Sequence, residues 1–228
     1  MEKWFFIDTG FKDPFFNMSF DESLMKYIED KEIVILRFFN FSPPSITLGA
    51  NQEIPEWVKE LSNKGFPYVK RPTGGRAVIH SNDFTYSIVF KKTNPLIGGS
   101  VLESFRKISE GFKRAFEILG IEVERVEKKG RIQSDLCFDD ISIYELSCKG
   151  KKLIGSAQAR RRDVCLQQGT VHLDEPDSNF PKSTGMITLK EILKKDIELK
   201  EFKDVVKRGF KDVFHIDYEE LNIEDIKI

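Results

Sequence analysis

The 228-residue sequence has few cysteines, no excess of charge of either sign and no long apolar run. Its three cysteines, Cys137, Cys148 and Cys165, are an odd number without a Cys-x-x-Cys pair, which argues against a disulfide framework and a zinc site. No apolar run approaches the roughly 18 residues of a membrane span, and the N-terminus lacks the apolar core of a signal peptide. We therefore expect a protein of the reducing cytoplasm, without a metal site or membrane contact.

The charge is dense but balanced, with 36 Lys and Arg against 37 Asp and Glu and a formal net charge of −1. A nucleic-acid-binding domain is typically strongly basic, so we expect no nucleic-acid partner. The sequence also lacks a Gly-x-x-x-x-Gly-Lys phosphate loop. Nothing in it therefore requires ATP, and we predict no cofactor.

Apolar residues at helical spacing and short apolar runs predict an α+β fold with a mostly antiparallel mixed sheet and flanking helices. The predicted helices are Pro14 to about Asp30, Pro55 to about Gly65, Val101 to Leu119, Leu189 to Lys194 and Leu199 to Phe214. The predicted strands are Trp4–Asp8, Ile33–Phe39, Ser45–Leu48, Tyr68–Lys70, Phe84–Phe90, Ile121–Arg125, Ile141–Ser147, Leu153–Gln158 and Val164–Leu173. We expect a catalytic domain over residues 1–174 and a helical extension over 175–228 packed on the same domain.

A glycine-containing stretch, Lys70-Arg71-Pro72-Thr73-Gly74-Gly75-Arg76-Ala77-Val78-Ile79-His80, lies between two predicted strands. Pro72 biases Arg71 toward an extended conformation, and two glycines in a row permit positive φ or close contact with a ligand. The following apolar residues predict a strand that carries His80 to a fixed place. A hairpin with a Gly-Gly turn and no ligand explains the same residues equally well.

A second stretch, Gly150-Lys151-Lys152-Leu153-Ile154-Gly155-Ser156-Ala157-Gln158, also combines a turn, a strand of small residues and a cation. On position alone, Lys152 reads more readily as a solvated turn residue than as a functional one. The small apolar residues after it, however, allow a backbone or acyl chain to pack closely. A cation beside such a groove can stabilise the oxyanion of an ester or thioester.

The two stretches, in this order, resemble those of the lipoate-protein ligase and octanoyltransferase superfamily, whose catalytic-domain fold is shared with biotin protein ligases. The closer resemblance is to the LipM-type octanoyltransferases. It covers about residues 4 to 174. Further supporting segments are Phe6–Gly10, Asn17-Met18 with Asp21-Glu22, Ser42–Pro44 with Leu48-Gly49, Cys137-Phe138, Tyr144–Leu146, and Gln168–Thr170 with Leu173-Asp174.

The resemblance implies catalytic roles for Lys152 and Cys137. Lys152 stands where the family has its active-site lysine. Cys137 lies in a polar loop, where a packing role is less natural than for Cys148 and Cys165, and the resemblance places the acyl-accepting cysteine there. The substrate-binding residues expected with them are Arg71, Thr73, Gly74, Gly75, Arg76, His80, Gly155, Ser156 and Ala157.

The activity that the resemblance implies is transfer of octanoyl from acyl carrier protein, through a thioester on Cys137, to a lysine of a lipoyl domain. Glycine cleavage H protein is the expected acceptor. The alternatives are a lipoate-protein ligase, which uses lipoyl-adenylate and no such cysteine, and a carrier-binding module in which Cys137 is incidental. The short segment after Asp174 disfavours the ligase, because ligases of the superfamily need an accessory domain or subunit.

Two further interpretations concern charge. The family usually has an acid after the histidine of the glycine stretch, whereas Ser81 follows His80 here, which weakens the case for a neighbouring carboxylate that orients the ring. Arg160, Arg161 and Arg162 lie close in sequence to Lys149, Lys151 and Lys152. This basic cluster is explained equally by solubility and by docking of an acidic carrier protein or a phosphopantetheine arm.

Overall fold

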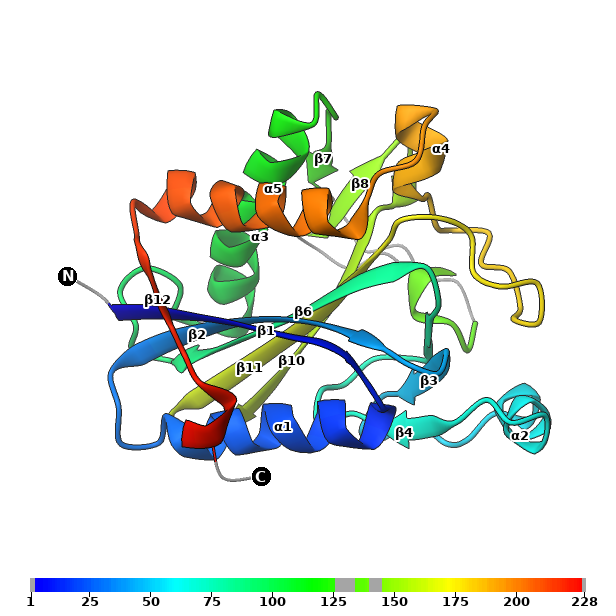
Figure 1. The fold of residues 1–228 in the computed structure, drawn as a ribbon, viewed down its shortest axis with the longest axis horizontal. Helices are drawn as coiled ribbons and strands as arrows, with labels where there is room; N and C mark the ends of the chain where they lie inside the picture. The colour runs from blue at the N-terminus through cyan, green and yellow to red at the C-terminus, as the bar shows by residue number, and fades with distance from the viewer. Residues whose placement is uncertain (1–2, 126–133, 140–144, 227–228) are drawn as a thin grey trace.

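A computed structural model describes residues 3–125, 134–139 and 145–226, which form a six-stranded sheet with helices on both faces (Figure 1). The strand order is β10-β11-β6-β2-β1-β12. The strands are β1 (Lys3–Lys12), β2 (Ile33–Phe41), β6 (Asp83–Lys91), β10 (Ile154–Arg161), β11 (Val164–His172) and β12 (Tyr218–Glu220). Neighbours from β10 to β2 are antiparallel, whereas β1 pairs in parallel with β2 and β12. The predicted α+β class with a mostly antiparallel mixed sheet is confirmed.

Two small sheets stand beside the main one. The first has the order β4-β3-β5 and is built from β3 (Ser45–Leu48), β4 (Tyr68–Lys70) and β5 (Val78–His80). The second has the order β7-β8-β9 and is built from β7 (Glu124–Arg125), β8 (Leu146–Cys148) and β9 (Lys151–Lys152). The first small sheet contains the strand of the glycine stretch, and the second contains the lysines of the second stretch.

Local signals in the sequence set the ends of the longer helices. The side chain of Asp13 accepts hydrogen bonds from the first turn of α1 (Pro14–Tyr27), and Pro14 occupies a position where its missing N–H costs nothing. Ser100 and Glu103 form a capping box at the start of α3 (Val101–Ile118). The remaining helices are α2 (Glu56–Asn63), α4 (Leu189–Leu193) and α5 (Leu199–Phe214), with short 3-10 turns η1 (Cys137–Asp139) and η2 (Ile223–Asp225).

The two faces of the main sheet carry separate cores. Helices α3 and α5 cover one face and α1 covers the other (Figure 1). On the first face the core is aromatic, and the Phe202 ring meets Phe84 edge-on at 5.1 Å. Strand β2 is buried along nearly its whole length, as its continuous apolar sequence predicts for a strand covered on both sides.

Most predicted elements are present, with differences at their ends. The strand predicted over residues 121–125 is limited to β7, and that over 153–158 begins at Ile154 and continues to Arg161. The strand predicted over 141–147 falls partly outside the described residues, since 141–144 are not among them. Strand β12 was not predicted, because three residues ending in two glutamates carry no apolar alternation. Among the described residues, no helix is long and apolar enough to cross a membrane.

The C-terminal segment takes part in the main core. Helix α5 packs on α3, and β12 adds to the main sheet beside β1 (Figure 1). The helices approach closely at two glycines: a Cβ on Gly209 would lie 2.5 Å from the carbonyl oxygen of Gly111 and 2.8 Å from the amide nitrogen of Ala115. The absence of a side chain at Gly209 is therefore needed for this contact.

We predict that Gly209→Ala lowers the free energy of unfolding by about 1–3 kcal/mol, the usual cost of overpacking a tight core. The sign is opposite to that of an ordinary helical Gly→Ala change, which stabilises by about 0.5–1 kcal/mol. Denaturant unfolding measures the difference, with the exposed neighbour Arg208→Ala as the matched control. A Gly209→Ala protein at least as stable as the wild type would contradict this packing.

Candidate active site

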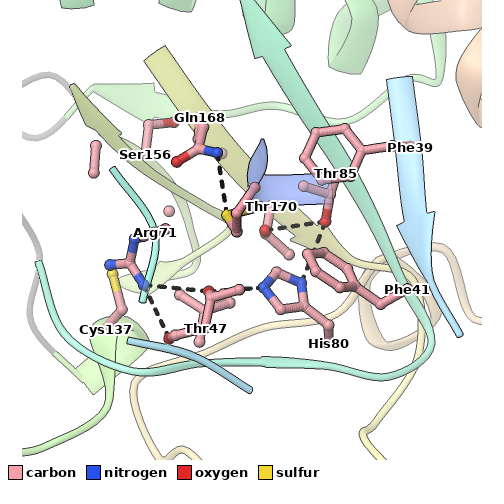
Figure 2. Close-up of a pocket in the computed structure, with 15 residues that line it drawn as sticks. Phe39, Phe41, Thr47, Arg71, His80, Thr85, Cys137, Ser156, Gln168 and Thr170 are labelled. Atoms are coloured by element: carbon pink, nitrogen blue, oxygen red, sulfur yellow. Dashed lines mark hydrogen bonds between the residues drawn. The ribbon is translucent and has the colours of Figure 1, made fainter. Parts of the chain in front are cut away.

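A pocket lies between one face of the main sheet and the small sheet that holds the glycine stretch (Figure 2). Strands β2, β6, β10 and β11 supply one wall, and β3 and β5 supply the other. The lining residues are Met18, Phe39, Phe41, Thr47, Arg71, Val78, His80, Thr85, Cys137, Gly155, Ser156, Ala157, Gln168, Gly169 and Thr170. Six of the predicted site residues are therefore gathered around one cavity: Arg71, His80, Cys137, Gly155, Ser156 and Ala157.

Cys137 is held at the pocket by the strand of the glycine stretch. Its backbone N–H donates to the carbonyl of Ala77 at 2.9 Å, and the N–H of Ala77 donates to the carbonyl of Asp135 at 3.0 Å. The Cys137 side chain is partly exposed, whereas Cys148 and Cys165 are buried, as predicted. Burial raises the pKa of the Cys165 thiol to about 11 and also raises that of Cys148. Of the three thiols, Cys137 is thus the one open to reaction.

Lys152 is buried and points at Cys137. Its Nζ lies 3.7 Å from the Cys137 Sγ and donates to the Cys137 carbonyl at 2.9 Å. It also forms an ion pair of 2.9 Å with Oε1 of Glu145, and the Lys152 side chain is only 2% exposed. The reading of Lys152 as a solvated turn residue is therefore wrong.

The surroundings keep this lysine charged. Burial by itself lowers the pKa of Lys152, but the Cys137 thiolate and the Glu145 carboxylate more than offset that effect, so the pKa is raised above its ordinary value. The Phe138 ring also lies 5.4 Å from the ammonium. Lys152 therefore places a positive charge beside Cys137 at neutral pH.

Glu145 was not predicted as a site residue, although it lies in one of the segments that carry the family resemblance. Only its position in the folded chain identifies it. The pairing of Ser147 with Lys152 between β8 and β9, and the hydrogen bond from Leu153 N–H to the Leu146 carbonyl, bring the two side chains together.

Arg71 closes the turn of the glycine stretch from inside. Its guanidinium donates to the carbonyls of Gly74 at 2.7 Å, Arg76 at 2.8 Å and Thr47 at 3.0 Å. Burial lowers its pKa, and the Cys137 thiolate opposes that effect. Figure 2 shows the Arg71 and Cys137 side chains next to each other. Arg71 thus adds a second cation near the thiol.

Gly74 and Gly75 do not line the pocket; they surround the Arg71 guanidinium. Gly75 has a φ of +92°, and a Cβ there would lie 2.9 Å from Nη2 of Arg71. A Cβ on Gly49 would lie only 1.9 Å from the carbonyl oxygen of Gly75. These contacts give Gly75 and Gly49 a structural reason, whereas a Cβ on Gly74 would meet no atom within 4 Å. Contact of Gly74 and Gly75 with substrate stays a prediction.

The other two predicted residues of this stretch also lie outside the lining. Thr73 donates from Oγ1 to Oε1 of Gln168 at 2.8 Å, and Arg76 donates to the carbonyl of Ser134. Gln168 does line the pocket and donates in turn to Asp21 at 2.6 Å. Thr73 therefore contacts a residue of the pocket lining, whereas Arg76 and Ser134 line a separate cavity with Gln52 and Asp135.

His80 is fixed on three sides. Its Nδ1 lies 2.7 Å from Oδ2 of Asp83, its Nε2 lies 2.9 Å from Oγ1 of Thr47, and the Phe41 ring stacks on it at 3.8 Å. A carboxylate thus orients the ring, although the serine after His80 weakened the case for one. The carboxylate comes from three residues along the chain, across the turn into β6, rather than from the position of Ser81.

Gly155 and Ser156 line the pocket for different reasons. A Cβ on Gly155 would lie 3.2 Å from Phe138 and 3.3 Å from Cε of Lys152, so a larger residue would press on both side chains. The Ser156 hydroxyl lies 2.9 Å from that of Tyr86, a residue that belongs to the core on the opposite face of the sheet. The small residues of this strand thus leave room for Lys152 and for the cavity.

A buried ionic network below the pocket was not predicted. Arg37 and Asp21 form an ion pair of 2.7 Å with both side chains fully buried. Asp21 also accepts from Ser87 at 2.7 Å and from Gln168 at 2.6 Å. Asp21 lies in a segment that carries the family resemblance, but the sequence does not show which residues it contacts.

The basic residues of the second stretch do not form one cluster. Arg160–Arg162 lie at the far end of β10 from residues 149–152, and an eight-residue strand spans roughly 25 Å. Arg161 pairs with Glu22 at 2.9 Å and Arg162 with Glu29 at 3.3 Å. The prediction of a single basic cluster is wrong, because the strand separates its two halves.

The described residues include no group of three or more His, Cys, Asp or Glu placed to hold a metal ion.

Comparison with known proteins identifies the family. The family described as lipoyl protein ligase A/B catalytic domain matches residues 13–211. An octanoyltransferase LipM of Staphylococcus aureus is 31% identical over 255 residues, covering 100% of this chain and 92% of that protein. One from Kyrpidia tusciae is 40% identical over 191 residues, covering 79% of this chain and 70% of that protein.

Solved structures share the fold. The structure of a T. acidophilum protein described as a putative lipoate protein ligase, with bound lipoic acid, has a TM-score of 0.78 at 22% identity. The match covers 99% of this chain and 92% of that one. A biotin protein ligase from Aquifex aeolicus in complex with biotin and ATP has a TM-score of 0.51 at 10% identity, covering 94% and 71%. The predicted likeness to lipoate and biotin ligase catalytic domains is confirmed.

The chain therefore belongs to the lipoyl protein ligase A/B catalytic-domain family. Its relatives named above are octanoyltransferases of the LipM type, which confirms the resemblance and the prediction of an acyltransferase of that class.

His172, the last residue of β11, is buried, and the Phe138 ring meets it edge-on at 4.8 Å. Its Nδ1 has no hydrogen-bond partner among the described residues, and burial lowers its pKa to about 4. The neutral ring is therefore the form that the fold accommodates.

We predict that the free energy of unfolding falls by up to about 3 kcal/mol between pH 6.5 and about pH 4 on account of His172. The sign follows because the unfolded chain takes up the proton near pH 6.5, whereas the folded chain resists it until about pH 4. Denaturant unfolding across this range should show a flatter pH slope in His172→Phe than in the wild type. The exposed His215, changed to Asn, serves as control; an identical slope in His172→Phe would refute the prediction.

Proposed function

We propose that this protein transfers an octanoyl group from acyl carrier protein to a lysine of a lipoyl domain by way of a thioester on Cys137. The observation that carries the proposal is the 3.7 Å distance between the Lys152 ammonium and the Cys137 sulfur, at the wall of a pocket lined by apolar side chains and by polar ones. Octanoyl is proposed as the acyl group because the relatives are named octanoyltransferases. Glycine cleavage H protein is the proposed acceptor, and the cytoplasm is the proposed compartment.

In the first step the Cys137 thiolate attacks the carbonyl carbon of the octanoyl thioester. A carbon–sulfur bond forms at Cys137, the bond to the carrier thiol breaks, and the carrier thiolate takes up the proton that Cys137 released. Lys152 stabilises the thiolate before attack and the oxyanion during it, because its ammonium is buried where water screens it little. The energy of the bond is already stored in the donor, so the step uses no nucleotide.

In the second step the neutral amine of the acceptor lysine attacks the Cys137 thioester. A carbon–nitrogen bond forms, the bond to sulfur breaks, and the amine loses one proton as the amide forms. The Cys137 sulfur leaves as a thiolate beside Lys152 and takes up the proton that the amine loses. The Lys152 ammonium thus stabilises the Cys137 thiolate twice, first as the nucleophile and then as the leaving group.

The pocket suits a saturated chain. Met18, Phe39, Phe41 and Val78 offer it apolar surface next to Cys137. Burial of seven carbons at about 0.8 kcal/mol each provides roughly 5–6 kcal/mol, enough to distinguish octanoyl from much shorter chains. Gly155 and Ala157 keep the strand beside the chain free of bulk.

The test is intact-mass analysis after incubation with octanoyl-acyl carrier protein and no nucleotide. We predict that the protein gains one octanoyl group on Cys137, removable with hydroxylamine, because Cys137 is the exposed thiol beside two cations. Cys137→Ala should lose both the adduct and transfer to a lipoyl domain.

Cys148→Ala and Cys165→Ala are the controls and should keep both activities. Transfer by Cys137→Ala supplied with ATP and free lipoate would support the ligase instead. Absence of any adduct on the wild type would reject the covalent route.

Lys152→Met should lower acyl transfer by about two to three orders of magnitude, the effect of removing one oxyanion donor. Methionine keeps most of the apolar stem, which matters because the side chain is buried. Lys151→Met is the matched control, since Lys151 is partly exposed and pairs with Glu191 at 3.5 Å. The test measures single-turnover rates of acyl transfer, with thermal unfolding of each variant to show that it is folded. Near-wild-type transfer by a folded Lys152→Met protein would contradict a role of Lys152 in the reaction.

A further inference from the structure

Glu145 and Lys152 form an ion pair with side chains only 4% and 2% exposed, and Lys152 lies between Glu145 and Cys137. A buried ammonium is costly unless anions accompany it. Cys137 can supply an anion only as a thiolate, because a thioester sulfur carries no charge. Glu145, by contrast, offers its carboxyl group 2.9 Å from the Lys152 ammonium and takes no part in the thioester.

We propose that Glu145 is a positioning residue that keeps Lys152 protonated and aimed at the sulfur while Cys137 carries the acyl group. The inference rests on the proposed function, since it concerns the acylated form of Cys137. Its distinct content is that Glu145 is needed mainly in the second half of the reaction. In the free enzyme the thiolate shares the task of balancing Lys152.

The backbone fixes this arrangement. Glu145 directly precedes β8, and β8 pairs antiparallel with β9, which carries Lys152. The Lys152 N–H and carbonyl are engaged in turn by Gly185 and Ile187, at 2.8 and 3.1 Å. The backbone positions from which the two side chains project are therefore fixed relative to each other.

The other charged or titratable groups near the pair do not replace the carboxylate. Arg71 lies near Cys137 and is a cation. Tyr86, on the Glu145 side, is neutral because burial raises its pKa to about 12. Tyr86 and Glu145 line a small cavity together with Gln167, which donates to the Tyr86 hydroxyl at 2.7 Å. Removal of the Glu145 carboxylate would therefore leave Lys152 with less negative charge beside it, and neither Arg71 nor Tyr86 supplies any.

The proposal makes opposite predictions for two reactions of Glu145→Gln. Alkylation of Cys137 by iodoacetamide should be as fast as in the wild type or faster, because the thiolate becomes the partner of Lys152. Transfer of octanoyl from the acylated protein to a lipoyl domain should slow by about tenfold to a hundredfold, the scale of a hydrogen bond to a charged group. A role limited to holding the fold would slow both reactions together.

The experiment measures both rates in the wild type, Glu145→Gln, Glu145→Asp and Glu191→Gln. Each protein is loaded with octanoyl-acyl carrier protein, its acylated form is followed by intact mass, and apo lipoyl domain is then added in a single turnover. Glu145→Asp retains the charge on a shorter side chain and should transfer at a rate between those of the wild type and Glu145→Gln. Glu191→Gln removes the carboxylate of the exposed pair with Lys151 and should change neither rate.

Normal transfer by a folded Glu145→Gln protein, or a parallel loss of alkylation and transfer, would overturn the proposal. If Glu145→Gln does not fold, the comparison is made on Glu145→Asp, where slower transfer with unchanged alkylation supports the proposal and equal rates overturn it. The failure of the proposed function looks different, because the wild type itself would then form no adduct.

Discussion

The site depends on one buried positive charge. Lys152 is held at the edge of the core, 2.9 Å from a carboxylate and 3.7 Å from a thiol, and its side chain is shielded from water. In such a place the electrostatic attraction between ammonium and thiolate is much stronger than at the surface. The geometry around it follows: Gly155 carries no side chain that would displace Lys152, and Phe138 lies against both.

Two segments far apart in the sequence meet at Cys137, each by a different interaction. The strand of the glycine stretch holds the Cys137 backbone through Ala77, and β9 approaches its sulfur through Lys152. Arg71 ties the turn of the first segment together by donating to three carbonyls. The position of the sulfur is thus set by backbone hydrogen bonds, which are less free to move than side-chain contacts.

Part of the fold and of the candidate site could be predicted from the sequence, as particular residues show. The helices starting at Pro14 and Val101 were predicted from apolar residues at helical spacing, and the first also from Pro14 at its start. Five residues that the two motifs named line one cavity, although their roles in the reaction stay predictions: Arg71, His80, Gly155, Ser156 and Ala157. Glu145, Asp83 and the Asp21–Arg37 pair could not be found as partners, because each contact joins separate elements and is set by strand pairing or a turn. The burial of Lys152 could not be read from its position alone for the same reason, because a turn residue becomes buried only when neighbouring segments cover it.

The polar groups that line the pocket satisfy one another. His80 joins Thr47 to Asp83, Asp83 accepts from Thr85 at 3.0 Å, and the hydroxyls of Thr85 and Thr170 lie 3.3 Å apart. A buried polar group that already has its partners loses nothing when an apolar chain covers it, whereas an unpaired group would lose its bonds to water. The network therefore lets a wall rich in hydroxyls and a histidine accept a saturated acyl chain. It also makes the wall rigid, since a change of any member would leave its neighbours without partners.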